Sequence, residues 1–388
     1  MKTFEINQPT KIVIGKDSLM NLGQYAAQYG NKAILVTENV SGPLAGIYRK
    51  ALRILEAAGV QAVHFDGVQA NPTTDIVAKG AVMAREAGAQ VVIGLGGGSS
   101  MDTAKAIAVE ATHEGTVWDY LHYKKQPDDR TLPIIAVTTT SGTGSQATPC
   151  AVITKTEDKD KSAVWNDHIF PKIAIVDPML MLSVPVGVTM QTGFDTFAHN
   201  FEAFLSVNGS LYTDTLALQG IRLAVENLPK LLEKPDDLAA RESMALADTL
   251  GGIVIASAGV TLPHGLGMQI SGHKPSVSHG QSLAVVYPEF TRFTWKYAVD
   301  KFAAAGRIFN PELNSADDTE AAKRCCAEID GFLRKIGLWI DFSALGVTKE
   351  EIREIANDGQ VLNDYKNNPV IASIDEMYDM LMNSYLRI

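Results

Sequence analysis

The chain has 388 residues, which is long for one hydrophobic core, so two domains are expected. Hydrophobic residues make up 46% and charged residues 20%, as in ordinary soluble globular proteins. The net charge of −10, without any basic run, argues against nucleic acid and anionic membranes as partners. Three cysteines, two of them adjacent, form no disulfide framework, and the N-terminus lacks an apolar signal-peptide core, so we expect a cytoplasmic protein.

The first half of the chain alternates short apolar runs with helical patterns. Residues 4–15 look like a pair of edge strands. Further strands are expected over 33–37, 60–65, 89–96, 132–140 and 172–178, and helices over 44–59, 74–87 and from Met101 onward. Strands that alternate with helices predict a parallel α/β sheet, and we assign residues 1–185 to this domain.

The pattern then changes to helical periodicity. We place the boundary near 180–187 and expect an all-helical second domain over 186–388. Between Asp248 and Lys274 there is no Asp, Glu, Lys or Arg, and this length could span a bilayer. The stretch holds Pro263, two histidines and several glycines, so a buried helix pair around a polar site is the better interpretation.

A glycine-rich segment follows one of the expected strands. The run GLGGGSSMDTAKAI (94–107) leads from a buried strand through three consecutive glycines into a helix. Glycines let the backbone approach a phosphate closely, and a helix N-terminus offers free N–H groups. Because three consecutive glycines exceed what a plain strand-to-helix turn needs, the segment favours phosphate binding.

Two further features fit a nucleotide. Glu38, just past the strand at 33–37, can accept hydrogen bonds from both ribose hydroxyls of NAD and would repel the 2′-phosphate of NADP. A solvated loop acid is the alternative interpretation of Glu38. The uncharged, hydroxyl-rich segment TTTSGTGSQ (138–146) suits hydrogen bonds to phosphate and to the nicotinamide amide, although alone it would be read as an ordinary Ser/Thr loop.

Four residues of the second half suit a metal. Asp195 and His199 are four apart in a helix-forming run, so their side chains share one face. His264 and His279 lie in PHG and SHG segments further on. One carboxylate and three imidazoles suit a divalent transition metal. For any single histidine, a satisfied core or surface residue is the alternative.

Together these motifs resemble a known family. Residues 71–107, 137–154, 175–185 and 193–204, with the PHG and SHG segments, resemble the iron-containing, group III alcohol dehydrogenases over essentially the whole chain. The resemblance implies a fold similar to dehydroquinate synthase and glycerol dehydrogenase, with an α/β nucleotide-binding domain and a helical domain. It also implies a homodimer or a larger homo-oligomer.

The resemblance assigns roles to individual residues. It implies NAD as the cofactor and a single Fe²⁺, with Zn²⁺ as the alternative. The implied metal ligands are Asp195, His199, His264 and His279. The implied cofactor-binding residues are Gly97, Gly98 and Ser99 for the pyrophosphate, Thr139, Thr140, Thr143, Asp102, Glu38 for the ribose, and Lys161 near the adenine end.

The chain departs from the family's pattern in places that concern the proton route. Met268 stands where the family usually has a second histidine that carries the alcohol proton, and Gln146 replaces an acid. His273 becomes the candidate catalytic proton carrier if Gly267 and Gly272 break the helix and let the segment fold back. A surface role for His273, with the proton leaving through water, is the alternative.

The expected chemistry is hydride transfer between NAD and a substrate oxygen-bearing carbon, with the metal as a Lewis acid. Glu202, on the same helix face as His199, is expected to orient a ligand imidazole. No Lys or Arg lies between Lys172 and Arg222, so we expect a small uncharged alcohol, diol or aldehyde. The alternatives are a dehydroquinate synthase-like lyase, a glycerol dehydrogenase-like enzyme and a non-catalytic relative.

Overall fold

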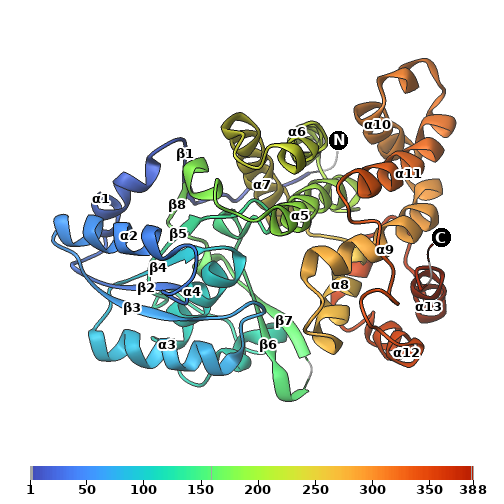
Figure 1. Ribbon diagram of the computed structural model, residues 1–388. Helices are drawn as coiled ribbons and strands as arrows, with labels where there is room; N and C mark the ends of the chain where they lie inside the picture. The colour runs from blue at the N-terminus through green and yellow to red at the C-terminus, as the bar shows by residue number, and fades with distance from the viewer. Residues whose placement is uncertain (1–2, 159, 386, 388) are drawn as a thin grey trace. The chain divides into compact units, whose positions relative to one another are not determined.

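The computed structural model describes residues 3–158, 160–385 and 387. Its contacts divide the chain into two compact units, whose elements Figure 1 labels. Residues 8–184 form the first, which we call the α/β unit. Residues 3–7 and the chain from Pro185 onward form the second, which we call the helical unit.

The α/β unit is built on a six-stranded sheet in which all neighbouring strands are parallel. In spatial order the strands are β1 (Lys11–Ile14), β8 (Ile173–Val176), β5 (Ile134–Thr138), β4 (Val91–Gly96), β2 (Lys32–Glu38) and β3 (Gln61–Val68). Every residue of β4 and β5 is buried. These strands are continuous apolar runs because helices cover both faces of the sheet, and the predicted parallel α/β sheet is confirmed.

Two hydrophobic cores lie on opposite faces of this sheet. The covering helices are α1 (Leu22–Ala26) and α2 (Ala45–Ala57) on one face, and α3 (Thr74–Ala87) and α4 (Gly98–Glu110) on the other. In β2, Leu35 packs in the cluster that contains Leu55 of α2, whereas its neighbour Ile34 packs in the cluster that contains Ile107 of α4. Side chains alternate along a strand, so one strand serves both cores.

Three details of the α/β unit differ from the expectations. Residues 4–15 contain one strand among those described, β1, because Pro9 has no backbone N–H to donate to a ladder. The fourth helix begins at Gly98 rather than Met101, since the glycines already form its first turn. An antiparallel hairpin of β6 (Cys150–Lys155) and β7 (Asp160–Trp165) was not predicted.

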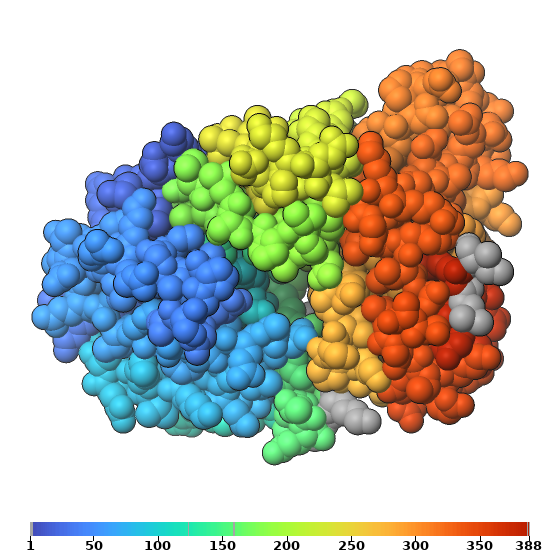
Figure 2. All heavy atoms as spheres, viewed as in Figure 1, coloured from blue at the N-terminus to red at the C-terminus, as the bar shows by residue number. Residues whose placement is uncertain are grey.

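Helices make up the regular structure of the helical unit in the part of the chain described. They are α5 (Val186–Leu205), α6 (Leu211–Glu233), α7 (Leu238–Ala258), α8 (Leu262–His273), α9 (His279–Thr294), α10 (Val299–Phe309), α11 (Asp318–Lys335), α12 (Lys349–Asp358) and α13 (Ile374–Asn383). Figure 2 shows the heavy atoms as spheres, with the later helices of the chain in orange and red. The predicted helical domain is therefore confirmed.

Short 3-10 helices complete both units. In the α/β unit they are η1 (Ser18–Asn21), η2 (Val117–Tyr123), η3 (Ser145–Ala147), η4 (Thr156–Asp158), η5 (Asp167–Ile169) and η6 (Pro178–Met181). In the helical unit they are η7 (Trp295–Tyr297), η8 (Pro311–Ser315) and η9 (Asn363–Asn367). Two of them, η3 and η9, bear on the sites described below.

Helix α5 runs through the centre of the helical unit. Every residue from Gly193 to Leu205 is buried. The rings of Phe194 and Phe197 lie 5.0 and 6.1 Å from the ring of Tyr287 in α9. The polar residues of α5 are therefore also in the interior, where an unpaired polar group is costly.

The uncharged stretch between Asp248 and Lys274 forms parts of α7 and α8. No single helix among the described residues is long and apolar enough to cross a membrane. Helices α7 and α8 pass the test of length and composition only together, and they are bent by 102° at the break between them. The expected helix pair is present.

The packing of α9 on α5 generates a test of the fold. A side chain at Gly280 would collide with the backbone carbonyl of Gln191 in α5. We expect Gly280→Ala to lower the free energy of unfolding by about 1–3 kcal/mol, seen as a lower urea midpoint. Gly331→Ala in α11 is the matched control, because nothing lies within 4 Å of its added Cβ, and its midpoint should stay or rise. Equal midpoints for the two variants would contradict this packing.

Candidate metal and nucleotide sites

Asp195 and His199 project from the same side of α5 into the interior of the helical unit. The side chain of Asp195 is 4% exposed and that of His199 is 7% exposed. Their facing atoms, Oδ1 of Asp195 and Nε2 of His199, lie 3.8 Å apart. The spacing of four residues thus places a carboxylate and an imidazole together, as predicted.

Two more imidazoles reach the same carboxylate oxygen. Nε2 of His264, on α8, lies 3.4 Å from Oδ1 of Asp195, and Nε2 of His279, the first residue of α9, lies 3.7 Å from it. The ring of His264 stacks on that of His199 at 4.5 Å and meets that of His279 edge-on at 5.2 Å. Three imidazole nitrogens therefore surround one carboxylate oxygen.

The four side chains differ in how deeply they lie. Candidate ligand atoms of Asp195, His199 and His264 all lie within 4.8 Å of one another. The side chain of His279 is 28% exposed, so it marks the open side of the group. We call these four residues the Asp/His cluster.

The residues of the cluster fit a metal ion. Oδ1 of Asp195 and Nε2 of His264 are buried and make no hydrogen bond of good geometry within the described chain. Buried polar atoms almost always have a partner, so two such atoms facing each other indicate a missing ligand. A carboxylate with several imidazoles is a donor set for divalent transition metals.

Glu202 fixes the orientation of one imidazole of the cluster. Its carboxylate is fully buried, and Oε1 accepts hydrogen bonds from Nδ1 of His264 at 2.8 Å and from the hydroxyl of Tyr287 at 3.1 Å. Oε2 accepts from the backbone N–H of Thr261 at 2.9 Å. A proton on Nδ1 leaves the lone pair of Nε2 of His264 available to a metal ion bound beside Asp195. The expected role of Glu202 agrees with this geometry.

Sequence reasoning missed the other partners of Glu202. Tyr287 lies 85 residues away in the chain and Thr261 lies 59 away, so no local spacing connects them to α5. Thr261 sits just before α8, and its N–H is one of the groups that a helix start leaves unpaired. Glu202 thereby ties the start of α8 to α5.

The charges of the cluster require a cation. Burial opposes a charged imidazole, but Glu202 and Asp195 outweigh it and raise the pKa of His264 to about 10. Burial likewise opposes ionisation of Asp195, yet the imidazoles of His199, His279 and His264 lower its pKa to about 2. In the metal-free chain a proton supplies the positive charge that a divalent ion would otherwise supply.

The glycine segment of the α/β unit forms a strand-to-helix turn. β4 ends at Gly96, and α4 begins at Gly98, whose added Cβ would lie 2.5 Å from Cγ2 of Thr143. An added Cβ at Gly97 would lie 3.4 Å from Oγ1 of Thr140. The absence of these side chains lets the hydroxyl-rich segment lie against the N-terminus of α4.

The other residues expected at the pyrophosphate are near this turn. The backbone N–H of Thr139 donates to the carbonyl of Gly96 at 2.9 Å, which holds the ends of β4 and β5 together. Ser99 is in the first turn of α4, and its carbonyl accepts from Thr103 at 2.7 Å. The first turn of the helix offers N–H groups and a partial positive charge to an anion.

Asp102 binds the hydroxyl-rich segment at Ser145 and the strand β6 at Val152. Its Oδ1 accepts from Oγ of Ser145 at 2.6 Å, and its Oδ2 accepts from the N–H of Val152 at 3.0 Å. Burial raises the pKa of Asp102, while Lys105 lowers it. Both oxygens are engaged with the chain, so the structure gives Asp102 a positioning role, and direct contact with the cofactor remains a prediction.

Sequence reasoning missed Lys105. Its ammonium is fully buried and donates to the carbonyls of Ser145 at 2.7 Å, Thr148 at 3.0 Å and Cys150 at 2.7 Å. The only signal was a single lysine in the apolar run AKAIAV. Lys105 and Asp102 together fix the path of the chain around η3.

Glu38 lies at the expected edge of the six-stranded sheet, whereas Lys161 belongs to the separate hairpin of β6 and β7. Glu38 is the last residue of β2, which pairs in parallel with β4, so it lies at the same carboxyl edge as Gly96. Burial raises the pKa of Glu38. Nζ of Lys161 donates to Oδ1 of Asn71 at 2.9 Å, which ties β7 to the segment after β3.

The predicted break in the helix that carries His273 is wrong. α8 continues without interruption to His273, because Gly267 serves close packing: an added Cβ there would lie 3.0 Å from Oγ of Ser282 in α9. Nε2 of His273 lies 2.8 Å from Oδ2 of Asp358 in α12. Nine residues along an unbroken helix place His273 opposite to His264, so its contacts indicate a role in holding α12.

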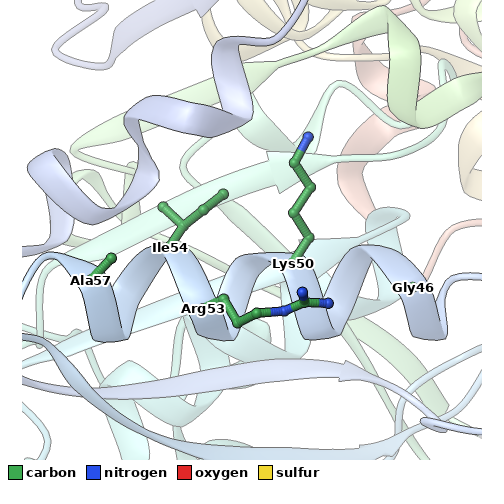
Figure 3. Close-up of a pocket in the computed structure, with 5 residues that line it drawn as sticks. All are labelled: Gly46, Lys50, Arg53, Ile54 and Ala57. Atoms are coloured by element: carbon green, nitrogen blue, oxygen red, sulfur yellow. The ribbon is translucent and has the colours of Figure 1, made fainter.

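A surface depression of the α/β unit lies apart from all the predicted site residues. It is lined by Gly46, Lys50, Arg53, Ile54 and Ala57 of α2. Figure 3 shows the side chains of Lys50 and Arg53 extending from the helix in different directions. Both residues are exposed, and nothing in the depression resembles the two sites above.

Comparison with known proteins identifies the class to which these sites belong. Residues 9–178 match the description "Iron-containing alcohol dehydrogenase", and residues 189–385 match "Fe-containing alcohol dehydrogenase family, C-terminal". The NAD-dependent methanol dehydrogenase of Bacillus methanolicus is 29% identical over 97% of this chain and 98% of that protein. The choline dehydrogenase of Bacillus subtilis is 36% identical over 83% of this chain and 80% of that protein.

Solved structures give the same result. An archaeal halo-thermophilic alcohol dehydrogenase from a Red Sea brine pool matches with a TM-score of 0.94 at 35% identity, over 99% of this chain and 100% of that one. The chain belongs to the iron-containing alcohol dehydrogenase family. It is an NAD-dependent oxidoreductase that acts on alcohols. It binds a metal, iron, at an Asp/His site.

Glu202 provides a test of how the Asp/His cluster is held. Glu202→Gln keeps the size of the side chain but removes the charge that fixes Nδ1 of His264. We expect a loss of metal affinity of roughly 10- to 100-fold, measured by competition with a chelator. Glu226→Gln, at an exposed ion pair of α6, is the control and should bind metal like the unmodified protein. Unchanged affinity in Glu202→Gln, with an unchanged melting temperature, would show that Glu202 does not orient the ligand.

Proposed function

We propose that the protein interconverts small primary alcohols or diols and their aldehydes, with Asp195, His199, His264 and His279 as the ligands of one Fe²⁺. The observation that carries this proposal is the gathering of three imidazole nitrogens within 3.8 Å of one buried carboxylate oxygen. We infer no nucleic acid or membrane partner and a homodimer or larger homo-oligomer. The free, mostly buried cysteines support a cytoplasmic protein.

The residues of the helical unit prepare the site for a substrate oxygen. When bound, the metal supplies a Lewis acid and NAD supplies the hydride acceptor or donor. Asp195, His199 and His264 are buried, and electrostatic interactions are stronger in the interior than in water. The side chain of His279 is partly exposed, so a substrate can approach the cluster from the side of His279.

The proton of the alcohol needs a route that the cluster itself does not supply. Met268, one turn after His264 on α8, cannot carry a proton. His273 faces α12, where it pairs with Asp358. We therefore propose that the proton leaves through water on the open side of the cluster, next to His279.

The α/β unit would hold the dinucleotide along the carboxyl edge of its sheet. In this proposal Gly97, Gly98 and Ser99 bind the pyrophosphate at the N-terminus of α4. Thr139, Thr140 and Thr143 offer hydroxyl and backbone groups beside them, with Asp102 positioning their segment. Glu38 accepts from the adenosine ribose, and Lys161 lies toward the adenine.

Metal content tests the ligand assignment. We expect anaerobically purified protein to hold about one iron per chain. His264→Ala should lose most of this iron together with activity, because the cluster loses its most buried imidazole. His168→Ala, in η5 of the α/β unit, is the control and should keep both. Full iron occupancy and activity in His264→Ala would refute the assignment.

The choice of cofactor tests Glu38. The unmodified enzyme should use NAD with a higher kcat/KM than NADP, because an ionised carboxylate repels the 2′-phosphate. Glu38→Gln should narrow the difference by about tenfold, since it removes one unit charge near the phosphate. Glu56→Gln, exposed on α2, should leave the ratio unchanged. Equal use of both cofactors by the unmodified enzyme would contradict the role of Glu38.

A further inference from the structure

An acidic side chain lies against the turn of helix that carries His264. Asp364 belongs to η9, which packs on α8. An added Cβ at Gly265, the residue after His264, would lie 3.6 Å from Cβ of Asp364 and 3.9 Å from its Oδ2. The carboxylate of Asp364 therefore lies against the backbone of Gly265, next in the chain to His264, and close enough for His264 to lower its pKa.

Asp364 has no partner of its own. Its carboxylate accepts no hydrogen bond from the part of the chain that the structure describes, although the residue is partly buried. Lys366, two residues later, donates to Oδ1 of Asn363 instead. Burial raises the pKa of Asp364 to about 6, against the influence of His264, which lowers it. Burial therefore opposes the ionised form of Asp364, and no partner in the described chain compensates for it. Such a carboxylate is a candidate for binding a ligand.

Asp364 gives the surroundings of the cluster one more negative charge than a divalent metal would balance. The carboxylates of Asp195 and Glu202 together balance the two charges of a divalent metal. Asp364 then adds a negative charge that no described side chain neutralises, and the metal itself favours its ionised form. The region next to the metal position is therefore suited to a positive charge on the substrate.

Met268 fits the same kind of substrate. It is three residues after Gly265, so the two positions are neighbours on one face of α8. Met268 is partly exposed and offers a soft, polarisable surface that suits methyl groups. A histidine at this position could have been a cation that competes for Asp364, whereas methionine leaves the carboxylate available.

We propose that Asp364 selects alcohols that carry an ammonium group within a few carbon atoms of the hydroxyl carbon. This inference rests on the proposed function and specifies its substrate. The lack of Lys and Arg near the cluster argued against anionic substrates, but it did not argue against cationic ones. The expectation of an uncharged substrate is thus extended to a positively charged one.

A pair of alcohols of equal shape tests the proposal in the iron-loaded enzyme with NAD. Choline carries a trimethylammonium group, and 3,3-dimethylbutan-1-ol carries a neutral tert-butyl group in its place. We expect kcat/KM to favour choline by roughly tenfold or more, which corresponds to about 1.4 kcal/mol. Asp364→Asn should remove most of this preference and leave kcat/KM for the neutral alcohol within about twofold.

Two further variants make the test specific. Asp364→Glu keeps the charge and should keep the preference for choline. Asp379→Asn removes an exposed charge of α13 and should change neither alcohol. A binding measurement by calorimetry on the metal-loaded protein should show the same preference without depending on turnover.

The outcomes separate this inference from the proposed function. If the enzyme oxidises both alcohols equally, and Asp364→Asn changes neither, the role of Asp364 is refuted and the proposed function stands. If no alcohol is oxidised, the proposed function fails, and equal dissociation constants for the two alcohols would refute the role of Asp364 as well. An equal loss of kcat for both alcohols in Asp364→Asn, with an altered pH profile, would make Asp364 a proton carrier and overturn the selection proposal.

Discussion

The structure of the helical unit depends on one buried carboxylate with three imidazoles around it. Asp195 is placed on the central helix α5, where every neighbouring residue is in the core, and its Oδ1 faces the imidazoles of α5, α8 and α9. Such an arrangement is costly without a positive charge at its centre. We therefore expect a bound metal to help hold these three helices together, as well as to take part in the chemistry.

Several features of the packing serve this arrangement. Glu202 joins α5 to the start of α8 and to Tyr287 of α9, so one buried acid connects all three helices. Gly280 lets α9 start in contact with the backbone of α5, next to His279. The α/β unit uses the same principle with Asp102 and Lys105, which are buried charged side chains that hold the chain around η3 in place.

Features that depend on the local spacing of residues could be predicted from the sequence. Features that depend on contacts between distant parts of the chain could not. The parallel sheet followed from apolar runs that alternate with helices, and the position of Glu202 followed from helical spacing to Asp195 and His199. The hairpin was missed because one of its two strands, β7, begins with the polar residues DKS and has no continuous apolar run. Gly267 of α8 looked like part of a break because its close packing against Ser282 is invisible in the sequence. Asp364 was missed because 100 residues separate it from His264.

X-ray diffraction from iron-loaded crystals at the iron absorption edge tests the central claim most directly. We predict one anomalous peak per chain, about 2.0–2.2 Å from Asp195 and from the Nε2 atoms of His199, His264 and His279. A peak elsewhere, or one that lacks Asp195 as a ligand, would contradict the account.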